Sequence, residues 1–538
     1  MGTPSSCVAG SAQAIRRRLK GEKTKTQRPP VRRTGAAFFV SQKKLNSATT
    51  PFKVPPNIPT KAKMLPLYDG FAYKPHQITA ISWMLDREAQ AESGGLLCDE
   101  MGLGKTIEIL GLMKESEKKR TLLLCPKAVI SQWVEKACQS KFNVMELVNG
   151  TWTLSSDKIR LQFNWLFITN YEKAREDTFS IFKRERPWDR IVLDEAHRIR
   201  NESSTGFKAV ASLERKSLWA VTATPIVNKV KDMNNLFRLV GFKSARLNNP
   251  LERIKVIHEA CLHRSMEEMR TTLKELPAAP IITKEVLDFT TAEEGDFYRS
   301  VQGKIAARWK HIEHDNTKEM FVLLMRLRQL SLHPQVYISA MKRKSILGGY
   351  QRDNWDEPST KFIALKQKLE DTPLPSKWIV FCQFHDEMEI LQAYLETSPA
   401  VYKVSQYHGG MSDSQKKEVI ESTKDPLPMN SEARHEVLLL QLQSGGVGLN
   451  LQHCGKVVFM SPWWTAALMD QAIGRAVRIG QKDTVEVTML VLKEEETMNI
   501  DEKMLAKAEE KRGMLDMAFK HASRGAEAAE VVEEEDPQ

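Results

Sequence analysis

Short runs of β-branched and aliphatic residues alternate along the chain with longer stretches in which apolar residues recur at helical spacing. This alternation is typical of parallel sheets covered by helices. We expect buried strands at residues 122–125, 166–169, 190–193 and 218–222 in the first half, and at 378–381, 437–442, 457–460 and 485–492 in the second. Residues 246–355 carry helix-period segments such as 321–332 and few strand signals. The pattern predicts an α/β protein with two parallel-sheet lobes and a helical connecting region.

The ends of the chain differ in composition from the middle. Residues 1–63 hold fourteen Lys or Arg and one acid, and their prolines and small polar residues break any regular period, so we expect a disordered basic tail. After Arg524 the chain has six acids and no base, which predicts a solvated acidic tail. The expected division is a basic tail at 1–63, a first lobe at 64–245, a helical region at 246–355, a second lobe at 356–512 and an acidic tail at 513–538.

The net charge of +11 suggests a polyanion as partner. Fourteen bases and one acid give the first tail +13, and the last tail has −6, so only +4 remains for residues 64–524. We therefore expect the lobes to bind nucleic acid through individual lysines, hydroxyls and backbone amides, while the basic tail serves import or loose anchoring.

The apolar runs argue against a membrane-spanning protein, and the cysteine pattern argues against a zinc-binding or disulfide-rich one. The longest apolar runs, such as 121–124 and 437–442, are far shorter than the about 20 residues that span a bilayer, so we expect no membrane partner. The seven cysteines are scattered, with no Cys-x-x-Cys pair that could begin a zinc site or a disulfide framework. This usage predicts no bound zinc and favours a reducing, intracellular compartment.

A glycine-rich segment follows the apolar residues 95–98 and precedes a helical run at 107–113. A strand, a glycine-rich turn and a helix form the context in which backbone N–H groups cradle phosphates. The predicted nucleotide site consists of Asp99, Glu100, Met101, Gly102, Leu103, Gly104, Lys105 and Thr106. Lys105 would contact the β- and γ-phosphates and the Thr106 hydroxyl would bind Mg²⁺, although Asp99 replaces the usual first glycine.

Two carboxylates end the predicted strand at 190–193. At the carboxyl edge of a parallel sheet, where ligands of such folds bind, Asp194 would hold Mg²⁺ and Glu195 would orient or deprotonate the attacking water. The pair could also be an ordinary solvated strand end, but the phosphate loop in the same lobe favours the catalytic interpretation.

Two arginines in the second lobe, Arg475 and Arg478, are three residues apart. On a helix they would share one face and reach together for a γ-phosphate, where arginine stabilises the charge of phosphoryl transfer. Taken alone, arginines at this spacing are more often surface charges.

Together these segments resemble superfamily 2 motors, and specifically the Snf2 family of double-stranded DNA translocases. The resemblance runs from about Tyr68 to Lys511 and rests on residues 99–106, 194–197, 222–228, 444–451, 462–464 and 471–481. It implies two RecA-like lobes, ATP and Mg²⁺ as cofactors, and Asp in place of the first loop glycine. Ala223 departs from the family, which usually has glycine there, and this limits backbone freedom.

The resemblance also implies roles that spacing does not give. Gln77 matches the residue that reads adenine, and His197, Thr222 and Thr224 match the segments that couple hydrolysis to lobe motion. Contacts to the DNA backbone are implied for Lys127, Thr169, Ser444 and Gly445, so binding should be largely independent of base sequence and sensitive to salt. For Trp463 and Trp464, core packing and nucleic-acid contact both remain open.

The implied activity is ATP-driven translocation on double-stranded DNA, with remodelling of chromatin, including nucleosomes, or of other protein–DNA complexes in transcription regulation or DNA repair. A strand-separating DNA or RNA helicase and a weakly hydrolysing nucleic-acid scaffold are the alternatives. The lobes look most similar to the branch of the helicase-like transcription factor, whose zinc-binding RING the cysteine pattern does not support.

The basic tail leaves the compartment open. Residues 16–33 are typical of a nuclear localisation signal or a DNA-anchoring arm, whereas the acid-poor, Ala/Ser/Arg-rich start also resembles a mitochondrial transit peptide. Gly2 and Ser6 match the loose myristoylation pattern without a supporting membrane signal. We expect a nuclear protein, with the mitochondrion as the alternative.

Overall fold

The computed structural model describes residues 64–513 except 158, 161–163, 174–186, 275, 313–316, 345–348, 428–431, 446–448, 479–480, 482 and 494–498. Residues 1–63 and 514–538, which carry the predicted basic tail and all but the first residue of the acidic tail predicted at 513–538, lie outside this part of the chain. The described residues form two compact units, the first ending at Leu276 and the second covering Pro277–Glu509.

The first unit is built on an eight-stranded sheet with the order β4-β3-β5-β2-β6-β7-β1-β8. Its strands are parallel except for the antiparallel β3–β4 hairpin at one edge. They span β1 (Gly94–Leu97), β2 (Arg120–Cys125), β3 (Asn143–Val148), β4 (Thr151–Leu154), β5 (Trp165–Asn170), β6 (Trp188–Asp194), β7 (Arg215–Val221) and β8 (Cys261–Leu262).

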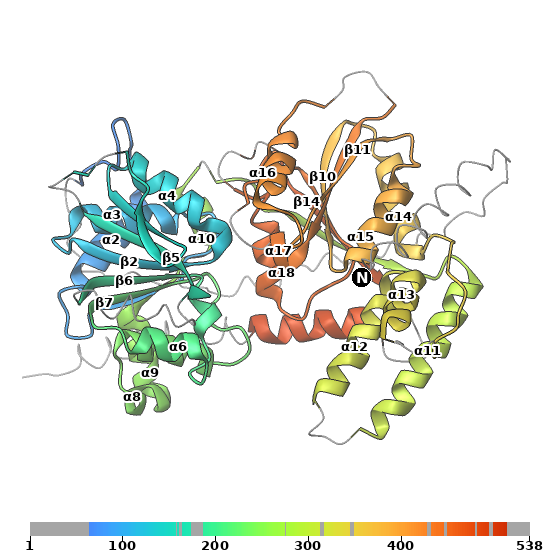
Figure 1. Ribbon diagram of the computed structural model, residues 1–538, viewed down its shortest axis with the longest axis horizontal. Coiled ribbons are helices and arrows are strands. Elements are labelled where there is room, and N and C mark those ends of the chain that lie inside the picture. Colours follow the sequence, from blue (N-terminus) through green and yellow to red (C-terminus); the bar gives the residue numbers. More distant parts are fainter. Residues whose placement is uncertain are drawn as a thin grey trace, which may run out of the picture. The chain divides into compact units, whose positions relative to one another are not determined.

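Helices pack around this sheet, as Figure 1 shows for α4 and for α6 with α9. They are α2 (Pro75–Arg87), α3 (Lys105–Glu115), η2 (Lys127–Val129), α4 (Ile130–Gln139), η4 (Ala196–Ile199), α6 (Thr205–Ala211), α7 (Lys231–Val240), α8 (Ser244–Asn248), α9 (Pro250–Ala260) and α10 (Met266–Thr272). Local sequence fixes several ends: Pro75 and Pro250 occupy first-turn positions, and the Asn249 side chain accepts from the N–H groups of the next turn.

The second unit contains a six-stranded, all-parallel sheet with the order β11-β12-β10-β13-β14-β9. The strands span β9 (Ile281–Leu287), β10 (Ser376–Cys382), β11 (Val401–Tyr407), β12 (His435–Gln441), β13 (Lys456–Phe459) and β14 (Glu486–Leu492). Its helices are α11 (Ala292–Lys310), α12 (Thr317–Leu332), α13 (Pro334–Lys344), α14 (Thr360–Asp371), α15 (His385–Leu395), α16 (Asp413–Ser422), α17 (Leu442–Gly445) and α18 (Ala466–Ile473), followed by a helix at 500–513.

Alternation along β10 divides the core of the second unit between two faces of its sheet. Trp378 and Val380 belong to a cluster with α14 and α15, whereas Ile379 and Phe381 belong to a cluster with α18. Figure 1 shows α14 and α15 on one side of the sheet and α16 to α18 on the other. Both faces are therefore buried, which explains why these strands are continuous apolar runs.

The α/β fold with two parallel sheets is confirmed, and all eight predicted strands are present. The single helical region expected at 246–355 is wrong in one respect, because the structure divides this stretch between the units. It contains β8, which completes the first sheet beside β1, and β9, which completes the second beside β14. Helices α11 to α13 form the predicted helical body, and their core also includes Leu492 of β14 and Ile500 and Met504 of the last helix.

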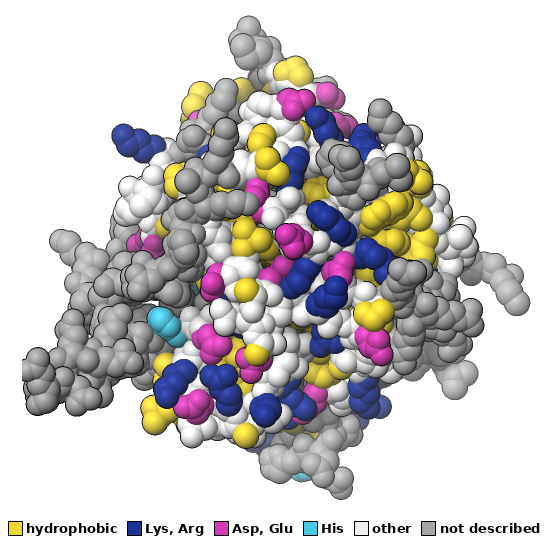
Figure 2. All heavy atoms as spheres, turned by 90° about the vertical axis from the view of Figure 1, so that its left-hand side faces the viewer, with side chains coloured by type: hydrophobic (Ala, Val, Ile, Leu, Met, Phe, Trp, Pro, Cys, Tyr) yellow, Lys and Arg dark blue, Asp and Glu magenta, His cyan; other side chains and the backbone are white. Residues whose placement is uncertain are grey.

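Acidic and basic side chains are interspersed on the surface. On the face in Figure 2, Lys and Arg lie among Asp and Glu rather than in one field of positive charge. This mixture is consistent with the small net charge expected between the tails.

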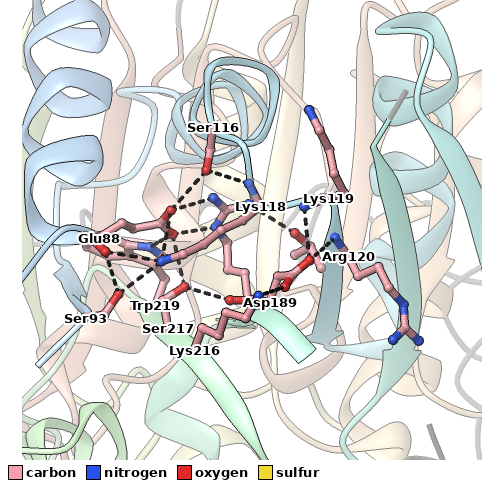
Figure 3. Close-up of polar contacts among 12 residues, drawn as sticks. Glu88, Ser93, Ser116, Lys118, Lys119, Arg120, Asp189, Lys216, Ser217 and Trp219 are labelled. Atoms are coloured by element: carbon pink, nitrogen blue, oxygen red, sulfur yellow. Dashed lines mark hydrogen bonds and ion pairs between the residues drawn. The ribbon is translucent and has the colours of Figure 1, made fainter. Parts of the chain in front are cut away.

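A buried carboxylate, Glu88, joins β6 and β7 of the first sheet (Figure 3). It contacts Arg190 near the start of β6, whereas Asp194 ends that strand. Arg190 at the start of β6 donates from Nε to Oε1 at 2.6 Å and from Nη2 to Oε2 at 2.7 Å. Ser217 and Trp219 of β7 donate to Oε1 at 3.1 and 3.0 Å. Burial would raise the pKa of Glu88, but the Arg190 guanidinium outweighs it and the pKa falls to about 2.

We expect Glu88→Gln to destabilise the first unit by about 3–5 kcal/mol, because it leaves the guanidinium of Arg190 buried without its counter-charge. The lowered pKa means that this contribution is present above about pH 4.5 and is lost as the pH falls toward 2. Urea unfolding at pH 7 and pH 3 measures both effects.

The control is Asp69→Asn, because Asp69 is 95% exposed and pairs with Lys141, which is 46% exposed. It should cost less than about 1 kcal/mol. An equally small cost for Glu88→Gln, or a cost that does not shrink at pH 3, would contradict the role given to this cluster.

Candidate active site

The glycine-rich segment forms a turn between β1 and α3, as predicted. Gly102 and Gly104 adopt φ values of +93° and +95°, which side chains rarely tolerate, and Gly104 caps the N-terminus of α3. The Lys105 ammonium folds back over the turn and donates to the carbonyls of Asp99 at 2.6 Å and Glu100 at 3.2 Å. These contacts hold a positive charge at the end of α3 where phosphates bind in such turns.

Gln77 lies directly against this turn. Its Nε2 is 3.4 Å from the Leu103 carbonyl, and its Oε1 accepts from the N–H of Lys74 at 3.1 Å. A Cβ atom at Gly104 would come within 2.5 Å of Gln77 Nε2 and would strain the backbone at φ +95°, so a substitution there would displace the Gln77 amide. The structure thus brings Gln77 and the turn together, although they are far apart in sequence. Met101, Gly102 and Thr106 are half-buried in the same turn.

The carboxylates of Asp99 and Glu100 contact other parts of the protein. Asp99 is fully buried and bonded to Arg264, and Glu100 Oε2 accepts from the N–H of Met266 at 2.7 Å. Both carboxylates are therefore engaged within the protein, and the nucleotide contacts expected for these two residues stay a prediction.

Asp194 ends β6 at the carboxyl edge of the sheet. Its Oδ2 accepts from Trp133 Nε1 at 2.8 Å and its Oδ1 from the Glu195 N–H at 3.1 Å. Burial and the neighbouring Glu195 raise the pKa of Asp194 to about 6, while the Trp133 hydrogen bond and the Lys105 charge oppose this rise. The loop lysine and this carboxylate therefore act on each other within one site.

A chain of polar groups leads from Glu195 to β7. Glu195 has a left-handed backbone at φ +53°, and its Oε2 lies 3.4 Å from His197 Nδ1. The same ring nitrogen is 3.1 Å from Thr222 Oγ1 and 3.3 Å from Thr224 Oγ1. The structure thus joins the residue expected to handle the water with the three residues expected to couple hydrolysis to motion.

The donor set suits a hard divalent cation. The Asp194 carboxylate is an oxygen ligand of the kind that Mg²⁺ prefers, and it lies at the carboxyl end of β6 next to a second carboxylate, Glu195. The Thr106 hydroxyl at the start of α3 is the second oxygen that the sequence predicts.

The residues expected to contact DNA differ in accessibility. Lys127 in η2 is exposed, but Thr169 in β5 is 1% exposed. The Thr169 side chain is buried next to the end of β5, and the DNA contact expected for this residue stays a prediction. In the second unit, Ser444 of α17 donates to Gln441 Oε1 at 2.7 Å, and Gly445 ends that helix. The following residues 446–448 lie outside the described part of the chain.

Arg475 and Arg478 do not share a helix, which corrects the expectation from their spacing. Helix α18 ends at Ile473, Gly474 caps it, and the next N–H groups make bonds of the tighter i−3 type to Ala472 and Ile473. Arg475 is buried, and Arg478 Nε donates to the Gly474 carbonyl at 2.9 Å. Burial lowers the pKa of Arg478.

The tryptophan pair packs around a buried arginine. The Arg328 guanidinium lies 4.3 Å from the ring centre of Trp463 and 5.7 Å from that of Trp464. Both rings are half-buried and contribute to separate core clusters. Packing therefore accounts for much of both side chains.

Sequence reasoning missed three residues that shape the site: Trp133, Tyr171 and Arg264. Trp133 binds Asp194 as described, and Tyr171 Oη donates to the Asp194 carbonyl at 2.7 Å. Arg264 bonds Asp99 from 165 positions along the chain. The only signal for Arg264 was the aspartate in place of glycine at position 99, which requires a counter-charge once it is buried.

Comparison with known domains agrees with this geometry. Residues 76–336 match the SNF2-related domain, and residues 360–480 match the helicase conserved C-terminal domain. The chain belongs to the Snf2 family of helicase-like ATPases. ATP is therefore the nucleotide expected at the loop of Lys105.

Snf2 relatives with several assigned roles resemble this chain at low identity. The "Probable global transactivator" of Orgyia pseudotsugata multicapsid polyhedrosis virus is 26% identical, over 82% of this chain and 91% of the viral protein. The "Chromatin remodeling factor mit1" of Schizosaccharomyces pombe is 23% identical, over 82% of this chain but 32% of its own length. The "DNA repair protein RAD5" of Candida albicans is 22% identical, over 78% and 55%.

Among solved structures, the "Sulfolobus solfataricus SWI2/SNF2 ATPase core in complex with dsDNA" is 24% identical. It covers 86% of this chain and 96% of its own, with a TM-score of 0.36. Within the described part of this Snf2 chain, no helix is long and apolar enough to cross a membrane.

Proposed function

We propose that this chain is a DNA-stimulated ATPase that translocates on double-stranded DNA and remodels chromatin or other protein–DNA complexes, in transcription regulation or DNA repair. The observation that carries the proposal is the chain of contacts from Asp194 to β7. Asp194 accepts from the Glu195 N–H, Glu195 lies beside His197, and His197 lies beside Thr222 and Thr224. The Lys105 charge on the nucleotide turn also favours the ionised form of Asp194. This set contains both the groups for hydrolysis and a route by which hydrolysis reaches the sheet.

In the proposed reaction, Gln77 meets the adenine and Lys105 exchanges the carbonyls of Asp99 and Glu100 for phosphate oxygens. Glu195 accepts a proton from water as the water oxygen bonds to the γ-phosphorus and the bond to the β-phosphate oxygen breaks. Mg²⁺, held by Asp194 and Thr106, would neutralise charge on the phosphates. Arg475 and Arg478 would stabilise the charge that develops on the γ-phosphate.

The hydroxyls of Thr222 and Thr224 would respond to a change in the position or charge of His197 and transmit it to the end of β7. Because His197 also faces Glu195, loss of the γ-phosphate changes the charge that this ring meets. The two lobes would bind ATP and ADP differently. Their contacts with DNA, which we assign to Lys127, Ser444 and Gly445, would then change during the cycle. Ala223 stands between the two threonines, and we expect it to reduce coupling more than hydrolysis.

Displacement of a third DNA strand tests translocation without strand separation. We expect the protein to release a triplex-forming oligonucleotide from duplex DNA in an ATP-dependent manner, and to leave a forked duplex unseparated. Separation of the forked duplex would favour the helicase alternative. Neither activity, together with nucleic-acid binding and slow hydrolysis, would favour the scaffold alternative.

Recruitment to nucleosomes, the branch of the helicase-like transcription factor and a nuclear location belong to the same proposal. The RAD5 relative, which is named a DNA repair protein, supports the branch. The basic segment 16–33 supports nuclear import, with a mitochondrial location as the alternative.

A further inference from the structure

The first residue of the nucleotide turn is anchored by a single buried arginine. Arg264 Nε donates to Asp99 Oδ1 at 3.1 Å and to Oδ2 at 3.0 Å, and Arg264 Nη2 also contacts Oδ2. Asp99 is fully buried and Arg264 is 5% exposed. Charge-assisted bonds of this kind, made in a fixed fork geometry away from water, are strong and directional.

The same guanidinium holds two further elements around the turn. Nη1 donates to the carbonyl of His76 at 2.5 Å, next to Gln77 at the start of α2. Nη2 donates to Glu108 Oε1 at 2.9 Å, in the first turn of α3. One side chain therefore fixes the turn, the helix that begins with Lys105 and the helix that carries Gln77.

Backbone contacts place Arg264 firmly against the turn. The Cys98 N–H donates to the Leu262 carbonyl at 2.7 Å, and the Glu100 N–H donates to the Arg264 carbonyl at 2.9 Å. His263 Nδ1 lies 2.9 Å from the Cys98 carbonyl. The segment after β8 thus lies along residues 98–100, and the turn cannot shift without breaking these bonds.

This cluster contains two buried carboxylates and one guanidinium. Asp99 and Glu108 share one guanidinium, and burial together with the Asp99 charge raises the pKa of Glu108. Removal of the guanidinium would leave two carboxylates buried side by side. They would then separate or take up protons, and either change moves the turn relative to α3.

We propose that Arg264 is a positioning residue that sets the arrangement of the nucleotide turn, α3 and Gln77, and thereby the affinity for ATP rather than the rate of the chemical step. The inference rests on the proposed ATPase function. It gives Asp99 its purpose, because the carboxylate in place of glycine is the acceptor that this arginine requires.

A buried ion pair elsewhere in the same sheet offers a matched control. Arg190 binds Glu88 through a similar two-point geometry (Figure 3), but it lies near the start of β6, whereas Asp194 ends that strand. Arg190→Lys should lower thermal stability and leave nucleotide affinity unchanged. Arg264→Lys removes a fork of the same kind beside the nucleotide turn.

The test measures the affinity for a fluorescent ATP analogue, the KM for ATP, kcat and the thermal midpoint of the full chain and its variants. For Arg264→Lys we expect affinity to fall and KM to rise by about tenfold or more, with kcat within about threefold. Asp99→Asn should give the same pattern, and the double variant should be no worse than Arg264→Lys alone.

If the nucleotide affinity and KM of Arg264→Lys are the same as those of Arg190→Lys, the inference is overturned, however much stability the variant loses. If Arg264→Lys does not fold, Asp99→Asn and Glu108→Gln decide by the same criterion. Failure of the proposed function is distinguishable, because a wild-type chain that binds the analogue but does not hydrolyse ATP contradicts the ATPase and leaves the affinity comparison intact.

Discussion

Glu195→Gln is expected to reduce ATP turnover by about 10²- to 10⁴-fold, which is the range that a general base contributes. The amide keeps the size of the side chain but cannot accept the proton of the attacking water. It can still lie beside His197, whose contacts with Thr222 and Thr224 do not involve residue 195, so the polar chain should persist and the thermal midpoint should change by no more than a few degrees. Steady-state phosphate release with duplex DNA measures the loss.

Lys105→Ala tests the other side of the same site. We expect a comparable loss of turnover, because the variant lacks the ammonium that would meet the phosphates. In the structure this ammonium donates to the carbonyls of Asp99 and Glu100. Glu252→Gln is the control for both variants, since Glu252 lies on α9 and pairs with exposed basic residues. Turnover like that of the wild type in Glu195→Gln or Lys105→Ala would remove the basis for the assignment.

Arg475→Lys is expected to lower turnover by about 10³-fold or more, as is typical when an arginine that stabilises phosphoryl transfer is lost. Lysine retains the charge, which limits the damage to a buried position, but it lacks the planar fork that meets two phosphate oxygens. Affinity for ATP should change by less than about threefold, because the contact forms mainly in the transition state. Single-turnover hydrolysis and nucleotide binding separate these effects.

Arg478→Lys should show a loss in the same direction, and Arg299→Ala serves as the control on the exposed side of α11, where Arg299 pairs with Asp296. Equal losses of affinity and turnover in Arg475→Lys would indicate a ground-state contact instead. Unchanged turnover in both arginine variants would mean that neither residue reaches the nucleotide.

The sheets could be predicted from sequence because most of their strands are buried on both faces. Strands such as β6 and β12 are continuous apolar runs, and a run of that kind between helical stretches has few other interpretations. The strands β8 and β9 could not be predicted in this way. β8 has only two residues, and β9 is an edge strand whose Ile281 and Ile282 are more than half exposed.

The site was predictable where one short segment carries the chemistry, as in the turn from Asp99 to Thr106 and the pair at the end of β6. It was not predictable where distant residues complete it. Nothing near position 264 indicates that its side chain would hold Asp99, and nothing near position 133 indicates a bond to Asp194. The spacing of Arg475 and Arg478 was misleading because Gly474 ends the helix on which their shared face depended.

The most direct measurement of the central claim is ATP turnover by the full chain with no nucleic acid, with duplex DNA, with single-stranded DNA and with RNA. We expect the greatest stimulation by duplex DNA, weakening as salt increases, and none of it in Glu195→Gln. Stimulation by RNA alone, or turnover that no nucleic acid changes, would contradict it.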